Sequence, residues 1–170
     1  FERIPEESIF FRMAQLRLSQ TLRQDDKPRA AIQVLERLKQ RQPKNAENFI
    51  RLGDIYRSQK DWDEAIFAYN TAINLTNRDS KSDWILYYSR GVALEQSGRW
   101  DMAEADFIKA LELAPNQPFI MNYLGYAWTE QGINLKKAEQ LIRKAVSLRP
   151  KDGYITDSLG WVLYQTSRFD

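Results

Sequence analysis

Residues 84–115 read WILYYSRGVALEQSGRWDMAEADFIKALELAP, and the other parts of the chain can be aligned with this stretch. Small residues fall in it where two helices of a hairpin would have to touch, as at Gly91 and Ala103. Helices that pack about 8–10 Å apart leave little room for side chains at their crossing, so we expect Trp100 and Phe107 to fill its flanks. The stretch therefore predicts two amphipathic helices joined by a Gly-containing turn.

The same pattern recurs along the chain, with a period of about 34 residues. The glycines at its first helix are separated by 38, 34 and 35 positions, at Gly53, Gly91, Gly125 and Gly160. Alanines follow 12 or 13 positions after the small residue of each of the first four repeats, at Ala31, Ala65, Ala103 and Ala138. Self-similarity of this kind predicts an array of stacked hairpins, in which each repeat buries its apolar face against its neighbours.

The residues Gly, Tyr, Gly, Trp, Ala, Phe, Ala and Pro at these spacings resemble the tetratricopeptide repeat (TPR). The segment Phe49-x-x-Leu52-Gly53-x-x-Tyr56 is a near-ideal copy of its first helix. The resemblance covers essentially the whole chain, and it implies an all-α solenoid in which antiparallel helix pairs form a right-handed superhelix. Arg90 departs from the pattern, because the sister repeats carry Leu at that position. We expect this departure to affect a single packing contact and not the fold.

We expect one array over residues 1–170, with repeats at about 12–45, 46–83, 84–117 and 118–152 and a half repeat at 153–170. Residues 1–11 are predicted to be the end of a preceding repeat or a linker. This division predicts nine helices and no β-sheet, with the first helix starting near Glu6. Leu159, Val162 and Leu163 are then expected to lack the second helix that would cover them. The predicted helix N-caps are Asn45, Asp61 and Asn134.

Composition narrows the function classes. Lys and Arg total 25 against 23 Asp and Glu, and a net charge of +2 gives no argument for a nucleic-acid or anionic-membrane partner. The chain has no Cys and no His, so we expect no disulfide, no thiolate or imidazole metal site and no catalysis by those groups. It also contains no apolar run of about 18 residues, so we expect no membrane span.

Carboxylates are the remaining groups that could suggest acid-base chemistry. Asp101, Glu104 and Asp106 fall at the start and on the outer face of a predicted helix, where we expect them to be solvated. We therefore expect neither an enzyme nor a bound cofactor.

The first helix of each tetratricopeptide repeat lines the inner surface of the superhelix, so the resemblance implies which side chains face inward. From the second repeat to the fifth, these positions change from charged to aromatic. The candidate groove residues are Tyr88, Phe119, Asn122, Tyr123, Tyr126, Tyr154, Asp157 and Trp161. Tyr and Trp combine a rigid apolar body with a polar tip and are enriched at binding surfaces. We expect the rings to anchor a peptide and Asn122 and Asp157 to hold its backbone; alternatively, the rings only pack between neighbouring helices.

The resemblance implies a protein-interaction scaffold or adaptor, which binds a peptide segment of a partner in its concave groove. Positions that hold the C-terminal carboxylate of chaperones in some family members carry other residue types here, so chaperone-tail binding is set aside. Two alternatives stay open: an RNA-binding helical repeat, which would need a sustained basic groove, and the regulatory arm of an enzyme that lies outside this chain. Self-association through the half repeat 153–170 is a further expectation. Residues 122–128 and 152–161 also look like helices of bacterial cell-envelope proteins of this family, which implies a periplasmic leaning.

Overall fold

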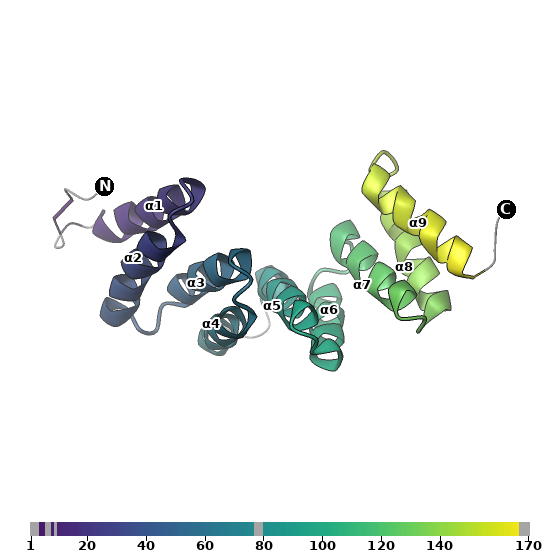
Figure 1. The fold of residues 1–170 in the computed structure, drawn as a ribbon, viewed down its shortest axis with the longest axis horizontal. Coiled ribbons are helices and arrows are strands. Elements are labelled where there is room, and N and C mark those ends of the chain that lie inside the picture. Colours follow the sequence, from purple (N-terminus) through teal and green to yellow (C-terminus); the bar gives the residue numbers. More distant parts are fainter. Residues whose placement is uncertain (1–3, 6–7, 9, 77–79, 167–170) are drawn as a thin grey trace.

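The computed structural model describes residues 4–5, 8, 10–76 and 80–166. These residues form nine α-helices, a short 3-10 turn and no strand (Figure 1). The helices are α1 (Phe11–Gln24), α2 (Pro28–Arg41), α3 (Ala46–Ser58), α4 (Trp62–Leu75), α5 (Trp84–Gln96), α6 (Trp100–Leu113), α7 (Pro118–Glu130), α8 (Leu135–Leu148) and α9 (Gly153–Gln165). The expected all-α array is confirmed. Residues 77–79 at the end of the second predicted repeat, most of residues 1–11 and the final four residues lie outside the described chain.

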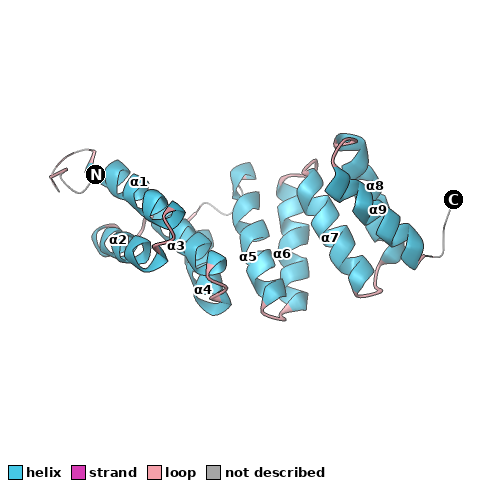
Figure 2. Ribbon diagram, turned by 45° about the horizontal axis from the view of Figure 1, so that its top comes forward, coloured by secondary structure: helices cyan, strands magenta, loops and turns pink. Residues whose placement is uncertain are grey.

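The helices pack as consecutive pairs, α1 with α2, α3 with α4, α5 with α6, and α7 with α8. The pairs stack one after another into an elongated crescent, with α1 and α2 at one tip and α9 at the other (Figures 1 and 2). Helix α9 packs against α7 and α8. Each pair therefore contacts mainly its neighbours in sequence, which is the defining property of a solenoid.

Glycine permits the closest approach within each pair. A Cβ atom added at Gly91 would lie 2.8 Å from Cε1 of Phe107, and one added at Gly53 or Gly125 would lie 2.7 Å from Tyr69 or Ile142. We predicted that Phe107 would fill the flank of the crossing. Instead its fully buried ring lies directly against Gly91. The large residue of the second helix thus occupies the space that the missing side chain leaves.

The predicted N-caps have different outcomes. The Asn45 side chain accepts a hydrogen bond from the Glu47 N–H at 3.1 Å, which confirms the cap of α3. Asp61 and Asn134 make no such bond at the starts of α4 and α8. Asn134 has a left-handed backbone with φ of 50°, whereas a capping residue normally has an extended one. Helix α1 begins at Phe11, later than the predicted start near residue 6.

The main apolar cluster runs through helices α3 to α9 and includes Phe107, Leu124, Trp128, Ile142 and Val162. The burial of Val162, which is 0% exposed, corrects the prediction that it would lack a covering helix. Val162 faces the α7–α8 pair that α9 packs against, and so it needs no further helix to be buried. Its two neighbours in that prediction, Leu159 and Leu163, are half-buried.

Two carboxylates expected to be solvated are engaged inside the array. Asp106 is only 5% exposed and forms an ion pair with Arg90 of α5. Glu104 accepts a hydrogen bond from the Trp128 indole N–H at 2.6 Å. Asp106 lies between the two helices of its own pair, α5 and α6, whereas Glu104 lies between α6 and α7 of the next pair. Neither side chain is therefore a free carboxylate on the outer face. Asp101 is exposed, in line with the prediction.

Candidate functional site

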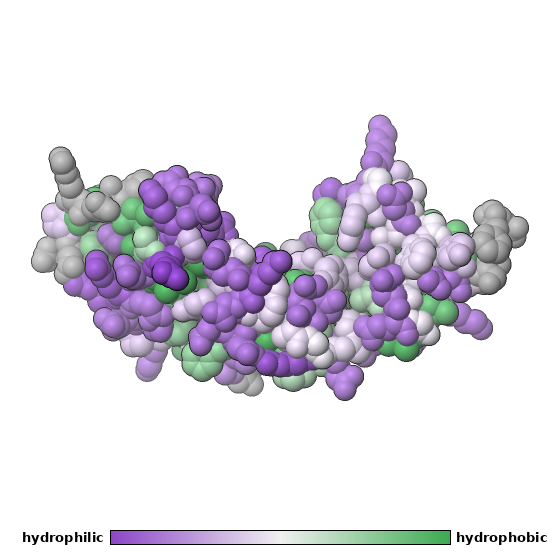
Figure 3. Space-filling model, viewed as in Figure 1, coloured by the Kyte–Doolittle hydropathy of each residue, from purple (hydrophilic) through white to green (hydrophobic). Residues whose placement is uncertain are grey.

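The inner side of the crescent is hollowed between α1–α3 at one end and α7–α9 at the other. Figure 3 shows this hollow at the top of the view, with a strongly hydrophilic wall on the α1–α3 side and a paler wall on the α7–α9 side. The predicted groove residues come from α5, α7 and α9. The change from charged to aromatic residues along the sequence thus corresponds to two unlike walls of one concave surface.

Three rings join the third and fourth repeats at the base of this surface. Tyr88 of α5 lies 5.8 Å from Tyr123 of α7 in an edge-on arrangement, and 6.0 Å from Phe107, between ring centroids. The Tyr123 hydroxyl also donates a hydrogen bond to Glu95 at 3.2 Å. Tyr88 and Tyr123 are half-buried, so they contribute to packing between helices, the alternative weighed for these rings in the sequence.

Other aromatic side chains of the set are exposed. Tyr154 of α9 is 65% exposed, Phe119 of α7 is 47% exposed and Tyr126 of α7 is 38% exposed. Phe119 lies under the guanidinium of Arg149, which is 4.7 Å from its ring centroid. Tyr126 and Tyr154 thus present large ring surfaces to solvent, which buried packing residues do not do.

Trp161 ties α9 to α7. Its indole N–H donates to Glu130 at 2.6 Å, and its ring stacks on Tyr164 with centroids 5.6 Å apart. Asp157, one turn before Trp161, is exposed. The polar edge of Trp161 is therefore satisfied within the protein, and Asp157 remains available to solvent.

Asn122 does not lie on the open surface. It is 1% exposed, and neither its side-chain nitrogen nor its oxygen has a hydrogen-bond partner. Its expected role of holding a ligand backbone is therefore corrected, because a ligand on the surface cannot reach a side chain that the neighbouring helices cover. A buried amide without partners lowers the stability of the fold, because no hydrogen bond replaces those that it made with water.

The tyrosine hydroxyls of three helices interact electrostatically. Burial raises the pKa of Tyr88, and among the smaller effects Tyr154 raises it while Arg57 lowers it. The pKa of Tyr126 is raised by burial, then by Glu130 and Tyr154. Tyr154 of α9 therefore lies within electrostatic range of Tyr88 of α5 and Tyr126 of α7.

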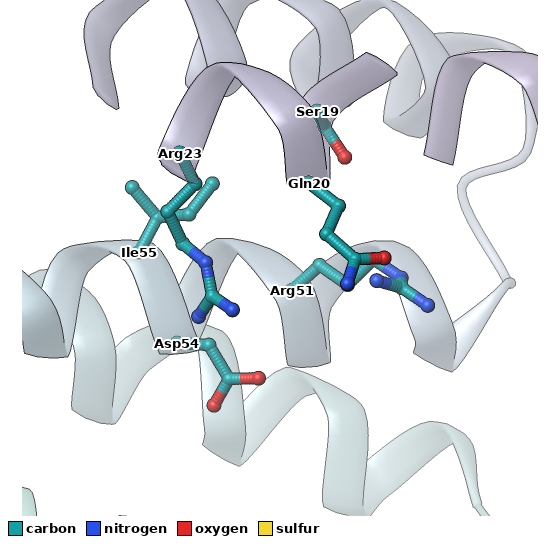
Figure 4. Close-up of a pocket in the computed structure, with 6 residues that line it drawn as sticks. All are labelled: Ser19, Gln20, Arg23, Arg51, Asp54 and Ile55. Carbon is teal, nitrogen blue, oxygen red and sulfur yellow. The ribbon is translucent and has the colours of Figure 1, made fainter. Parts of the chain in front are cut away.

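The opposite wall holds a small charged pocket between α1 and α3, of about 40 Å³. It is lined by Ser19, Gln20, Arg23, Arg51, Asp54 and Ile55, and Figure 4 shows the guanidinium groups of Arg23 and Arg51 on either side of it. Arg51 donates to Glu47 at 2.7 Å, one turn earlier on the same helix. Asp54 accepts a hydrogen bond from the buried Tyr69 hydroxyl at 2.7 Å, so it supports the helix pair as well as the pocket.

Sequence reasoning missed three charged residues that lie beside tyrosines or line the charged pocket. Arg57 and Glu95 stand four positions after Gly53 and Gly91, and both engage tyrosines: Arg57 donates to Tyr69, and Glu95 accepts from Tyr123. Arg23 stands four positions after Ser19, the small residue of the first repeat. Residues four apart share one face of a helix, so this spacing was the signal that could have found all three.

The structure gives no sign of a metal centre or a membrane span in its described residues. No group of three or more Asp and Glu side chains there is placed to hold a metal ion. None of the helices formed by residues 10–76 and 80–166 is long and apolar enough to cross a bilayer.

Sequence profiles of known families match three parts of the chain. A profile described as tetratricopeptide repeat matches residues 84–117, another with the same description matches residues 13–45, and one described as TPR repeat matches residues 53–98. The chain belongs to the tetratricopeptide repeat family. Proteins of this family and fold are typically interaction scaffolds.

A curated relative has the same family in its name. The chain is 27% identical over 158 residues to a TPR repeat-containing protein of Pseudomonas aeruginosa, with 93% of this chain covered. The match spans 26% of that relative, so the chain corresponds to about a quarter of its length.

Solved structures share the fold. MamA from Desulfovibrio magneticus superposes with a TM-score of 0.80 at 18% identity, covering 92% of this chain and 85% of that one. YrrB, whose structure is described as a TPR protein with an unusual peptide-binding site, superposes with a TM-score of 0.74 at 15% identity, covering 92% of this chain and 78% of that one. At these identities the likeness extends to the fold alone.

Proposed function

We propose that this chain binds a peptide segment of a partner protein along the inner surface formed by α5, α7 and α9. The observation that carries the proposal is the exposure of Tyr126 and Tyr154, at 38% and 65%, at positions that the family resemblance assigns to the concave side. Rings that only pack between helices are buried, as Phe107 is. Exposed aromatic side chains in a concave surface supply binding energy because a ligand can remove them from water on several sides.

The exposed residues divide into anchors and polar contacts. Tyr126, Tyr154 and Phe119 offer ring surface to apolar side chains of the ligand, and Asp157 is free to accept a hydrogen bond from its backbone. Tyr88 and Tyr123 form the base beneath them. The peptide-binding site described for YrrB supports the same use of this fold.

The experiment compares aromatic-to-alanine variants inside and outside the proposed surface. The partner is first captured from cell extract on the immobilised protein and identified, and its binding segment is made as a peptide. Tyr154→Ala and Tyr126→Ala are then compared with Phe67→Ala, because Phe67 is 64% exposed on α4, outside the proposed surface. Truncation of an anchor should weaken binding by about 2 kcal/mol or more, whereas Phe67→Ala should leave it unchanged.

Circular dichroism tests whether the variants are folded. All three should retain the helicity of the parent protein, so that a loss of binding cannot be due to unfolding. Equal affinity of the peptide for the parent protein and the two tyrosine variants would mean that the inner aromatic surface is not the binding site. A steep loss of binding with added salt and retention of RNA instead of peptide would favour the RNA-binding alternative.

A further inference from the structure

A second groove lies on the side of the array formed by the even-numbered helices. It runs between α6 and α8, has α7 at its base and encloses about 590 Å³. Figure 2 shows the three helices that form it in order along the crescent. Its lining residues are Ile108, Leu111, Glu112, Leu124, Trp128, Lys137, Gln140, Leu141 and Lys144. None of these residues belongs to the inner surface described above.

The base of the groove is apolar and recessed. Leu124 is 1% exposed and Trp128 is 6% exposed, while Ile108 on the α6 rim is 42% exposed. The indole N–H of Trp128 is already bonded to Glu104, so the ring needs no polar partner from a ligand. An apolar ridge inserted here would cover the side chains of Ile108, Leu111 and Leu141 without leaving a buried polar group unpaired.

The α8 rim is positively charged. Helix α8 carries Lys136, Lys137, Arg143 and Lys144 and a single carboxylate, Glu139, with which Arg143 is paired. In the described part of the chain, neither Lys137 nor Lys144 pairs with a carboxylate, and the Lys144 ammonium donates a hydrogen bond to the backbone oxygen of Pro115 at 3.2 Å. On the opposite rim, Glu112 is already paired with Lys109. Because the whole chain has a net charge of only +2, this positive edge is a local feature.

Lys137 and Lys144 are seven positions apart, so they lie along one edge of α8. Residues seven positions apart lie on the same face of an α-helix, about 10 Å apart along its axis. An antiparallel or parallel helix lying in the groove would place acidic side chains with the same spacing opposite Lys137 and Lys144. Its apolar side chains would enter between α6 and α8, as the ridges of packed helices do.

We propose that this groove receives an amphipathic helix of a partner protein, with an apolar ridge and acidic side chains about seven residues apart along one edge. A flat anionic membrane is the poorer occupant, because the base residues Leu124 and Trp128 are recessed below the rim. The proposal does not depend on peptide binding at the inner surface.

The test uses two synthetic helical peptides that differ only in charge. Both carry the same Leu and Ile ridge; one has Glu at two edge positions seven residues apart, and the other has Lys at those positions. Binding is measured by fluorescence anisotropy. The acidic peptide is expected to bind at least about tenfold more tightly than the basic one, a difference of about 1.4 kcal/mol.

Charge reversal on α8 then locates the site. Lys137→Glu with Lys144→Glu should reverse the preference between the two peptides, whereas Lys136→Glu, an equal change on the same helix outside the groove lining, should preserve it. Ile108→Ala should weaken both peptides severalfold, and Tyr154→Ala should weaken neither.

The proposal is overturned if neither peptide binds, if both bind equally, or if Lys136→Glu acts like the Lys137 and Lys144 changes. It is also overturned if vesicles containing phosphatidylserine sediment the protein in a manner that depends on Lys137 and Lys144 while the acidic peptide does not bind.

Discussion

Arg90 of α5 and Asp106 of α6 form a two-point ion pair, with Nε to Oδ2 at 2.7 Å and the terminal nitrogen to Oδ1 at 2.6 Å. Arg90 also donates to Asn70 of α4 at 2.6 Å. The second repeat has Leu52 and Ala68 at the equivalent places. One repeat of the array has therefore exchanged an apolar contact for a buried ion pair that reaches into the preceding repeat.

Removing one member of the Arg90–Asp106 ion pair should destabilise the fold more than removing both. Arg90→Leu alone should destabilise the fold by about 3 kcal/mol, because it leaves Asp106 charged and buried. Arg90→Leu with Asp106→Ala copies the second repeat and should recover most of that loss. Denaturant midpoints followed by circular dichroism measure both variants. Equal loss in the single and double variants would show that the arginine stabilises the array by other contacts.

The loss in Arg90→Leu should also depend on pH. Burial raises the pKa of Asp106, while the hydrogen bonds and charge of Arg90 lower it, so removing Arg90 should raise this pKa further. A carboxyl with a raised pKa in the folded state binds its proton more tightly there than in the unfolded chain, so the fold gains stability as pH falls through that pKa. The destabilisation should therefore be smaller near pH 5 than near pH 7. A difference between parent and variant that stays constant with pH would contradict this account.

Glycine should be required at the crossing in some repeats and not in others. Gly91→Ala places a Cβ 2.8 Å from the ring of the buried Phe107 and should cost about 1–3 kcal/mol. Gly160 of α9 is the matched control, because a Cβ there meets nothing within 4 Å. Gly160→Ala should raise stability by up to about 1 kcal/mol, since alanine is the better helix former. Thermal unfolding midpoints should thus shift in opposite directions, and a shared direction would refute the close-approach argument.

Replacing the unpaired Asn122 should stabilise the protein. Asn122→Leu keeps a side chain of similar branching and removes two buried polar atoms that lack partners, so we expect a gain of about 1 kcal/mol. Asn48 is the control: it is fully buried, but its side-chain nitrogen donates to the Gln42 carbonyl oxygen at 3.4 Å. Asn48→Leu breaks that bond, and its gain should be smaller or absent. If the midpoint of Asn122→Leu falls below that of the parent, the amide has a partner that holds it in place.

Much of the fold could be predicted from local periodicity. The small residues at the crossings and the period of about 34 residues specify the helix pairs, because both act between residues near one another in the chain. The repeat pattern also showed that Arg90 stands where the other repeats have Leu. Its partner Asp106 could not be recognised in the pattern, since an acidic residue near a helix start looks the same whether it is solvated or paired with a neighbouring helix.

The candidate site was predictable only as a set of positions on helix faces. The resemblance to the tetratricopeptide repeat implied that the aromatic residues of α5, α7 and α9 share the concave side, because repeat register assigns each residue to a helix face. The exposure of Tyr126 and Tyr154 and the burial of Asn122 and Val162 became known from the packing of the helices and not from the repeat pattern. The packing likewise showed that a groove opens between α6 and α8. Burial depends on how closely helices of different repeats approach, and that distance is set by side chains far apart in the sequence rather than by the period of any one helix.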